Sequence, residues 1–310
     1  MLDIYRTPDA AFEGLADFPF EPNYLEWDGL RTHYLDEGPK DGPVALLLHG
    51  EPTWSYLYRK MIPPLLAAGY RCVAPDLIGF GRSDKVTDDK WYNVDGHIDR
   101  MGEFIDLLDL HDITVFMQDW GGPIGLINAV AMPERFSRLV ILNTWLHHDG
   151  FEYTPAIRAW RDAAVNRHWL AWMRHDLPVG VIVRRTVVRP VDDPAAVERA
   201  YEAPYAGSIK SKAGARRFPW CIPFVEPEAG AADRQAVAFE ALKDWTKPVN
   251  VIFGADDPIF PPSWGAAWAG MIPGATFDVV EQAGHFCQED AGEDIVDRLL
   301  VRIAESDANG

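Results

Sequence analysis

The sequence has few cysteines, no long apolar run and no leader-like N-terminus. Three cysteines occur in 310 residues and none forms a C-x-x-C pair, which argues against a disulfide framework and favours reduced thiols in a cytoplasm. No apolar run approaches the roughly 20 residues of a membrane span, and the first residues lack the basic-then-apolar order of a signal peptide. We therefore expect a soluble cytoplasmic protein.

Basic residues are also scarce relative to acidic ones. With 29 Lys and Arg against 47 Asp and Glu, the formal net charge is −18, and no stripe of basic residues interleaved with aromatics is present. Such a charge opposes polyanions, so neither nucleic acid nor an anionic membrane is expected as a partner. Internal repeats and low-complexity segments are absent, which argues against a repeat architecture.

Apolar and aromatic residues, by contrast, are plentiful. Hydrophobic residues make up 48% of the chain and aromatics 12%, enough for a large core. Most of the 12 Trp must fill that core or line pockets, but an indole N–H is also a donor that an apolar cavity can direct at a ligand. The length fits one main domain with an inserted subdomain.

Short apolar runs alternate with longer helix-like stretches along most of the chain. This alternation is typical of a mostly parallel sheet with helices on both faces, so the expected fold class is α/β. Ligands bind such folds beyond the carboxyl ends of the strands, which makes the loops after these runs candidate sites. The expected strands are Val44–His49, Arg71–Pro75, Ile113–Met117, Leu139–Asn143, Val249–Phe253 and Thr276–Val280.

The strand pattern disappears in the middle of the sequence. There, Ala156–Val188 is predicted to be helical, because its aromatic and arginine residues recur at helix-compatible spacing. The strand-and-turn pattern then resumes before the last two expected strands. We therefore expect residues 146–218 to form a helical cap, inserted into a core domain of residues 1–145 and 219–310.

The third expected strand leads directly into Gln118-Asp119-Trp120-Gly121-Gly122. A strand, a residue that must turn sharply, glycines and then a helical pattern make a nucleophile elbow, with Asp119 in place of the usual serine. The glycine usual two residues before the nucleophile is Met117 here, so the motif is only half met. The alternative interpretation is that Asp119 caps the following helix.

The last two expected strands are followed by an acidic pair and a histidine. Asp256-Asp257 comes first and Gly284-His285 second, so nucleophile, acid and histidine follow the order of the α/β-hydrolase fold. We choose Asp257 as the partner of His285 and interpret Asp256 as a turn or capping residue. The predicted catalytic residues are Asp119, His285 and Asp257.

A fourth loop, His49-Gly50-Glu51-Pro52, follows the first expected strand. In this fold that loop and the residue after the nucleophile each supply a backbone N–H to an oxyanion hole, which assigns Glu51 and Trp120. Taken alone, the Gly50–Pro52 segment would be interpreted as a simple turn.

Together these motifs resemble the haloalkane dehalogenases, in particular those with Glu in the oxyanion loop and Asp-Trp-Gly at the elbow. Glu51 and Trp120 discriminate best, since the segment around residues 75–84 also resembles epoxide hydrolases. The matching core segments are His49–Arg59, Pro75–Asp84 and Gln118–Gly122, and the weaker cap matches are Tyr201–Pro204 and Arg216–Pro219.

The resemblance implies hydrolysis of halogenated alkanes to a primary alcohol, halide and a proton through a covalent alkyl-enzyme ester. It implies no metal or organic cofactor. Two indole N–H groups would hold the halide, one from Trp120 and one from the cap, where Trp160, Trp169 and Trp172 are candidates. Counting back from Tyr201 favours Trp169, with Trp172 as the runner-up. The residues expected to line the pocket are Pro123, Phe218, Pro219, Ile222, Ile259 and Phe260.

Three alternatives share part of this pattern. An epoxide hydrolase would use the same Asp-His-Asp residues with cap tyrosines as acids, for which Tyr153, Tyr201 and Tyr205 are available. A fluoroacetate dehalogenase would need arginine beside the nucleophile, and residues 119–125 contain none. A non-catalytic binding protein of this fold would usually lack a triad member. The expected partners are a small halogenated hydrocarbon, water and halide, with the chain a monomer or weak homo-oligomer.

Overall fold

The computed structural model describes residues 2–167, 169–224 and 226–309, without the side chains of Arg167, Trp169, Arg174 and residues 306–309. Its strands are β1 (Ile4–Tyr5), β2 (Asn23–Trp27), β3 (Leu30–Glu37), β4 (Val44–Leu48), β5 (Arg71–Pro75), β6 (Lys85–Val86), β7 (Ile113–Met117), β8 (Phe136–Ile141), β9 (Val249–Gly254) and β10 (Thr276–Val280). Its α-helices are α1 (Ile62–Ala67), α2 (Val94–Leu107), α3 (Gly121–Ala131), α4 (Pro155–Asp162), α5 (Trp169–Arg174), α6 (Val179–Thr186), α7 (Pro194–Glu202), α8 (Ala213–Arg217), α9 (Ala232–Leu242), α10 (Pro262–Met271) and α11 (Cys287–Asn309).

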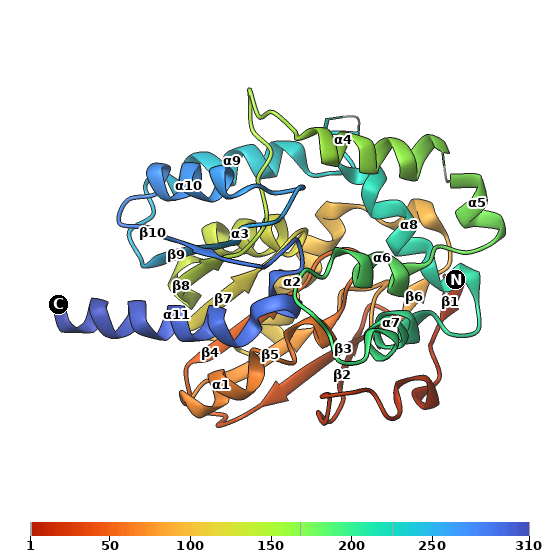
Figure 1. Ribbon diagram of the computed structural model, residues 1–310, viewed down its shortest axis with the longest axis horizontal. Helices are drawn as coiled ribbons and strands as arrows, with labels where there is room; N and C mark the ends of the chain where they lie inside the picture. Colours follow the sequence, from red (N-terminus) through yellow and green to blue (C-terminus); the bar gives the residue numbers. More distant parts are fainter. Residues whose placement is uncertain (1, 168, 225, 310) are drawn as a thin grey trace.

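An eight-stranded sheet in the order β10-β9-β8-β7-β4-β5-β3-β2 forms the centre of the molecule, with helices on both faces (Figure 1). Strands from β10 to β5 pair in parallel, whereas β3 pairs antiparallel with β5 and with β2. This mostly parallel sheet confirms the predicted α/β class and the α/β-hydrolase architecture. A separate two-stranded sheet joins β1 to β6.

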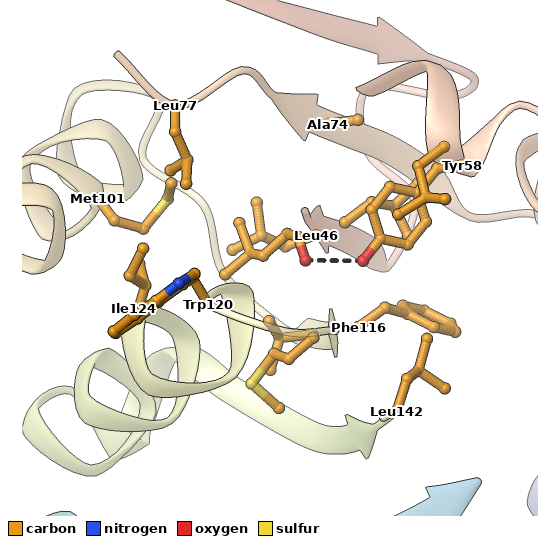
Figure 2. Packing of buried hydrophobic residues seen from close by; sticks show 14 of the residues in the cluster. Leu46, Tyr58, Ala74, Leu77, Met101, Phe116, Trp120, Ile124 and Leu142 are labelled. Carbon is orange, nitrogen blue, oxygen red and sulfur yellow. Dashed lines mark hydrogen bonds between the residues drawn. The ribbon is translucent and has the colours of Figure 1, made fainter. Parts of the chain in front are cut away.

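The central strands are apolar throughout because both of their faces are covered. Every residue of β4 and β7 is buried, as expected for strands between two helical layers. Figure 2 shows this packing, with Trp120 and Ile124 near Met101 on one side of the strands. Tyr58 is buried with them and satisfies its hydroxyl by donating to the backbone oxygen of Leu48 at 2.7 Å.

All six expected strands are present, but the β1–β6 pair and the β2–β3 hairpin were not predicted, and the position of one strand differs. The hairpin of β2 and β3 was not predicted, because its outer strand is only partly buried and lacks a continuous apolar run. The fourth strand was placed about three residues too late, since β8 runs over Phe136–Ile141. Asn143 therefore lies in the loop beyond the strand, where its backbone oxygen accepts a hydrogen bond from Asp119 N at 2.9 Å.

Between β8 and β9 the described residues form helices, turns and loops without a strand, as the loss of strand pattern predicted. The stretch Ala156–Val188 is not one helix but three short ones, α4, α5 and α6, with a π-helical turn at Ala163–Arg167. Helix α9 packs against α3 of the core. We keep residues 146–218 as the proposed cap, although its predicted end falls inside the short helix Phe218–Cys221.

Three further properties bear on the class of protein. None of the helices in the described part of the chain is long and apolar enough to cross a membrane. Cys72, Cys221 and Cys287 are free and buried. The longest helix, α11, begins two residues after His285 and has a kink at Ala291, where φ is −143°.

Candidate active site

Asp119 lies in a sharp turn between β7 and α3. Its φ of +51° is in the left-handed region, where a non-glycine residue is strained. Helix α3 has Trp120 as its N-cap and no side-chain cap, so the alternative interpretation of Asp119 as a capping residue is wrong. Met117 stands where a glycine is usual, two residues before the nucleophile. Its side chain is accommodated because residue 125 is glycine, where a Cβ would lie 2.6 Å from Met117 Sδ.

The Asp119 carboxyl group is buried and receives two backbone N–H groups. Glu51 N donates to its Oδ1 at 2.9 Å, and the N–H of Trp120 also donates to the carboxyl group. This approach requires glycine at position 50, because a Cβ there would lie 2.3 Å from Oδ1. The two residues predicted to form the oxyanion hole are thus both directed at the predicted nucleophile.

His285 lies between the two predicted carboxylates. Its Nδ1 lies 3.1 Å from Asp257 Oδ2, and its Nε2 lies 3.7 Å from Asp119 Oδ2. A carboxylate can only accept, so Nδ1 donates its proton to Asp257, and Nε2 is the ring nitrogen that faces Asp119. Asp256 is exposed, whereas Asp257 is 4% exposed, so the geometry agrees with the choice between the two.

Asn143 holds Asp257 in place, and its role was missed by the sequence reasoning. Its Nδ2 donates to Asp257 Oδ2 at 2.8 Å, and its Oδ1 accepts from Gly254 N at 2.9 Å. Ile259 N donates to the other carboxylate oxygen at 2.7 Å. The only signal in the sequence was the position of Asn143 at the end of an expected strand.

Burial and neighbouring charges set the protonation states of these groups. Burial raises the pKa of Asp119 to about 6, although His285 and the two N–H donors partly oppose this. Burial lowers the pKa of His285, but Asp257 and Asp119 outweigh it, so the pKa lies above its usual value. Burial, with Asp119 adding to it, raises the pKa of Glu51 well above its usual range, and both causes favour the neutral form of this carboxyl group.

A cavity of about 130 Å³ adjoins Asp119, His285 and Glu51. It lies between core and cap, since α4 contributes Ile157 and Trp160 while α6 contributes Ile182 and Thr186. The remaining lining residues are Pro52, Trp120, Trp145, Pro219, Ile222, Ile259, Phe260 and Phe286. The walls are therefore almost entirely apolar.

Four of the six residues expected to line the pocket do so: Pro219, Ile222, Ile259 and Phe260. The other two, Pro123 and Phe218, are not among the lining residues. Pro123 is a buried residue in the first turn of α3. Phe218 packs edge-on against Trp120, with ring centroids 5.5 Å apart, and so lies behind a wall residue.

The cap tryptophans differ in their relation to the cavity. Trp160 lines it, whereas Trp172 is not among the lining residues and packs against the Trp160 ring at 5.7 Å. The side chain of Trp169, the residue favoured by the sequence, lies outside the described residues. Within the described part of the chain, the indole N–H groups of Trp120 and Trp160 donate no hydrogen bond to the protein.

Among the described residues, the groups that the epoxide hydrolase and fluoroacetate dehalogenase alternatives require do not line this cavity. Tyr153 OH lies 2.9 Å from His147 Nδ1, and Tyr201 donates to Glu289 Oε2 at 2.7 Å. Tyr205 lies 3.5 Å from the backbone oxygen of Pro52. None of the three tyrosines, and no Arg or Lys of the described residues, lines the cavity. Across the same residues, no group of three or more potential ligands is placed to hold a metal ion.

Comparison with known proteins gives a consistent result. The family model described as alpha/beta hydrolase fold matches residues 43–169. A haloalkane dehalogenase of Mycolicibacterium paratuberculosis is 44% identical, over 96% of this chain and 98% of the relative. A haloalkane dehalogenase of Psychrobacter cryohalolentis is 40% identical, over 97% of this chain and 98% of the relative. The solved structure of haloalkane dehalogenase DpaA from Paraglaciecola agarilytica, described as tetrameric, is 35% identical with a TM-score of 0.86, over 96% of this chain and 97% of that one.

Proposed function

Because this chain belongs to the haloalkane dehalogenases, we propose that Asp119 attacks the halogen-bearing carbon of its substrate and that His285 drives hydrolysis of the resulting ester. The observation that carries this proposal is the buried Asp119 carboxylate at the wall of an apolar cavity, with His285 Nε2 at 3.7 Å. The enzyme is a hydrolase that cleaves carbon–halogen bonds. The residue roles below are our proposal.

In the first step, an oxygen of Asp119 forms a bond to carbon while the carbon–halogen bond breaks. The halogen leaves with both electrons of that bond as halide. A carboxylate is suited to this displacement at saturated carbon, which yields an ester. The apolar walls favour a carbon chain as the occupant, and the Glu51 and Trp120 N–H groups hold the carboxylate in position.

The departing halide requires donors, because an unsolvated ion in an apolar cavity carries a large free-energy penalty. We propose that the indole N–H groups of Trp120 and Trp160 supply them. Both residues line the cavity, and neither indole N–H donates a hydrogen bond to another of the described residues. Hydrogen bonds to a charged partner contribute roughly 1.5–3 kcal/mol each, so two of them offset part of the lost hydration.

In the second step, His285 Nε2 takes a proton from water while the water oxygen attacks the carboxyl carbon of Asp119. The oxyanion formed there accepts the N–H groups of Glu51 and Trp120, of which one donor is typically worth roughly 2.7–4 kcal/mol. Asp257 stabilises the imidazolium. The bond between the carboxyl carbon and the alkoxy oxygen then breaks, His285 gives its proton to the alkoxide to form the alcohol, and Asp119 keeps the oxygen from water and releases the second water proton as it returns to the carboxylate.

The rate of ester formation should depend on the ionisation of Asp119. Because its pKa is raised to about 6, we expect this rate to fall about tenfold for each pH unit below 6 and to level off above it. The measurement is rapid-quench formation of the alkyl-enzyme between pH 5 and 8. A rate that is flat from pH 5 to 7 would contradict the raised pKa.

Replacing Trp160 with Phe should weaken halide binding. The change keeps most of the apolar surface and removes one N–H, so the bromide Kd should rise roughly tenfold or more. Ester formation should slow as well, because this hydrogen bond strengthens as charge develops on the halide. Bromide quenching of tryptophan fluorescence and the halide-release rate test both effects.

Trp172→Phe is the matched control, because Trp172 packs against Trp160 without lining the cavity. It should change both quantities much less. The sequence-based choice is tested in the same series by Trp169→Phe. If that variant weakens bromide binding and Trp160→Phe does not, Trp169 is the second donor and our assignment to Trp160 is wrong.

The cavity volume favours small substrates. At about 130 Å³ it is small for a ligand cavity, since cavities for drug-sized ligands are about 300–1,000 Å³. Halide release from 1-bromobutane and 1,2-dibromoethane should therefore exceed release from long-chain substrates. Styrene oxide opening without halide release would instead support an epoxide hydrolase.

We also propose a cytoplasmic location and a monomer or weak homo-oligomer, with halogenated hydrocarbon, water and halide as partners. The free, buried cysteines support a reducing compartment. DpaA is described as tetrameric, so assembly is open to test. Light scattering across a concentration series would distinguish a concentration-independent tetramer from a monomer.

A further inference from the structure

Gln118 directly precedes the proposed nucleophile, and its side chain is fully buried against the catalytic histidine. Its Nε2 donates to the backbone oxygen of His285 at 3.0 Å and lies 3.4 Å from the ring Nε2 of the same residue. The carbonyl oxygen of His285 can only accept, which fixes the orientation of the carboxamide. The amide N–H groups, not the oxygen, therefore face His285.

This contact distinguishes the two protonation states of the imidazole. In neutral His285, Nδ1–H points at Asp257 and the Nε2 lone pair can accept from Gln118. In the imidazolium, Nε2–H would face another N–H. The charged groups that act on His285 are Asp257 and Asp119, and both favour the imidazolium, whereas burial disfavours it; Glu51, whose pKa is raised, lines the same cavity. Gln118 is thus the neighbour that opposes them.

The other end of the carboxamide supports a functional role. Gln118 Oε1 is buried and has no hydrogen-bond partner among the described residues. A buried amide oxygen without a partner destabilises the fold, and an apolar side chain of similar length would avoid that cost. Among the described residues, the hydrogen bonds of the Gln118 carboxamide therefore go to His285.

We propose that Gln118 is a positioning residue for His285: its amide anchors the backbone of the histidine loop and disfavours protonation of Nε2, so that the imidazole is neutral when it takes a proton from water. The inference rests on the proposed role of His285 as the base of the second step. Gln118 acts through His285 and takes no part in breaking the carbon–halogen bond. It should therefore affect the hydrolysis step selectively.

The test is Gln118→Met, which keeps the side-chain length and removes the amide. Single-turnover experiments measure ester formation and ester hydrolysis separately from pH 5 to 9. We expect hydrolysis to slow several-fold near neutral pH and its midpoint to move up by about half a unit to one unit. Ester formation at pH 8, where Asp119 is ionised, should change by less than about twofold.

Gln235→Met is the matched control, because Gln235 is an equally buried glutamine whose amide donates to Gly230 and not to His285. It should leave the midpoint of hydrolysis unchanged. Gln118→Asn is a second variant in case the Met variant does not fold. Its shorter side chain withdraws the amide from His285 without introducing an apolar group, so the midpoint should move in the same direction.

Each outcome decides something different. If Gln118→Met and Gln118→Asn slow both steps in proportion and leave the midpoint unmoved, Gln118 has only a structural role and the proposal is overturned. An unchanged hydrolysis rate and midpoint overturns it too. If the wild-type enzyme forms no ester on Asp119, the proposed function itself fails, a result that is visible without any Gln118 variant.

Discussion

Asp119→Asn is expected to abolish turnover while leaving the fold intact. The amide has the shape of the carboxylate but is a far weaker nucleophile, so no ester forms. Removal of a residue that acts in such a catalytic unit costs roughly 10⁴- to 10⁶-fold in kcat. Halide release from 1-bromobutane measures the effect. The protein must be checked by mass spectrometry, because deamidation would restore the Asp.

Stability should move in the opposite direction from activity in this variant. The raised pKa of Asp119 means that folding disfavours the carboxylate at neutral pH, so a neutral amide removes that cost. The Tm should be equal to or above that of the wild type at pH 7. The two backbone N–H donors can still bond to the amide oxygen.

Asp256→Asn is the matched control, since it makes the same substitution at an exposed acid beside Asp257. It should retain activity. Wild-type turnover by verified Asp119→Asn protein would remove Asp119 from its proposed role. Inactivation by both changes would indicate that loss of charge near the site, and not loss of the nucleophile, is responsible.

His285→Phe should trap the alkyl-enzyme. Asp119 can still displace halide, but no group removes a proton from water, so the ester persists. The phenyl ring fits the site, because His285 already lies between the rings of Phe260 and Phe286, with centroids 5.2 and 4.6 Å away. We expect one equivalent of halide per enzyme, steady-state turnover lower by roughly 10⁴-fold or more, and a mass increase of one alkyl group.

Peptide mapping should locate that added mass on Asp119. His111→Phe is the control, because His111 is exposed and far from His285 in the sequence. This variant should turn over normally without accumulating an adduct. Combining Asp119→Asn with His285→Phe should eliminate the adduct. If exposure to a bromoalkane adds no mass to His285→Phe, or adds it elsewhere, the two-step scheme is wrong for this enzyme.

Much of the core fold could be predicted because its strands are buried on both faces. Such strands produce continuous apolar runs, as in the Val44–Leu48 strand, and these are visible in a single sequence. The β2–β3 hairpin was missed because partly exposed edge strands lack that pattern. Likewise, the end of β8 depended on where the backbone of Asn143 turned to meet Asp119, which no local pattern records.

The sequence by itself determined which loops hold Asp119, His285 and Asp257, because each residue directly follows an apolar run and parallel strands bring their carboxyl ends to one edge of the sheet. Only the tertiary structure decided which other residues surround Asp119, His285 and Asp257. That Trp160 lines the cavity, that Phe218 lies behind Trp120, and that the Gln118 amide contacts His285 all depend on packing between segments far apart in the chain. A single sequence does not record such packing, because several helical registers of the cap bury its aromatic residues equally well.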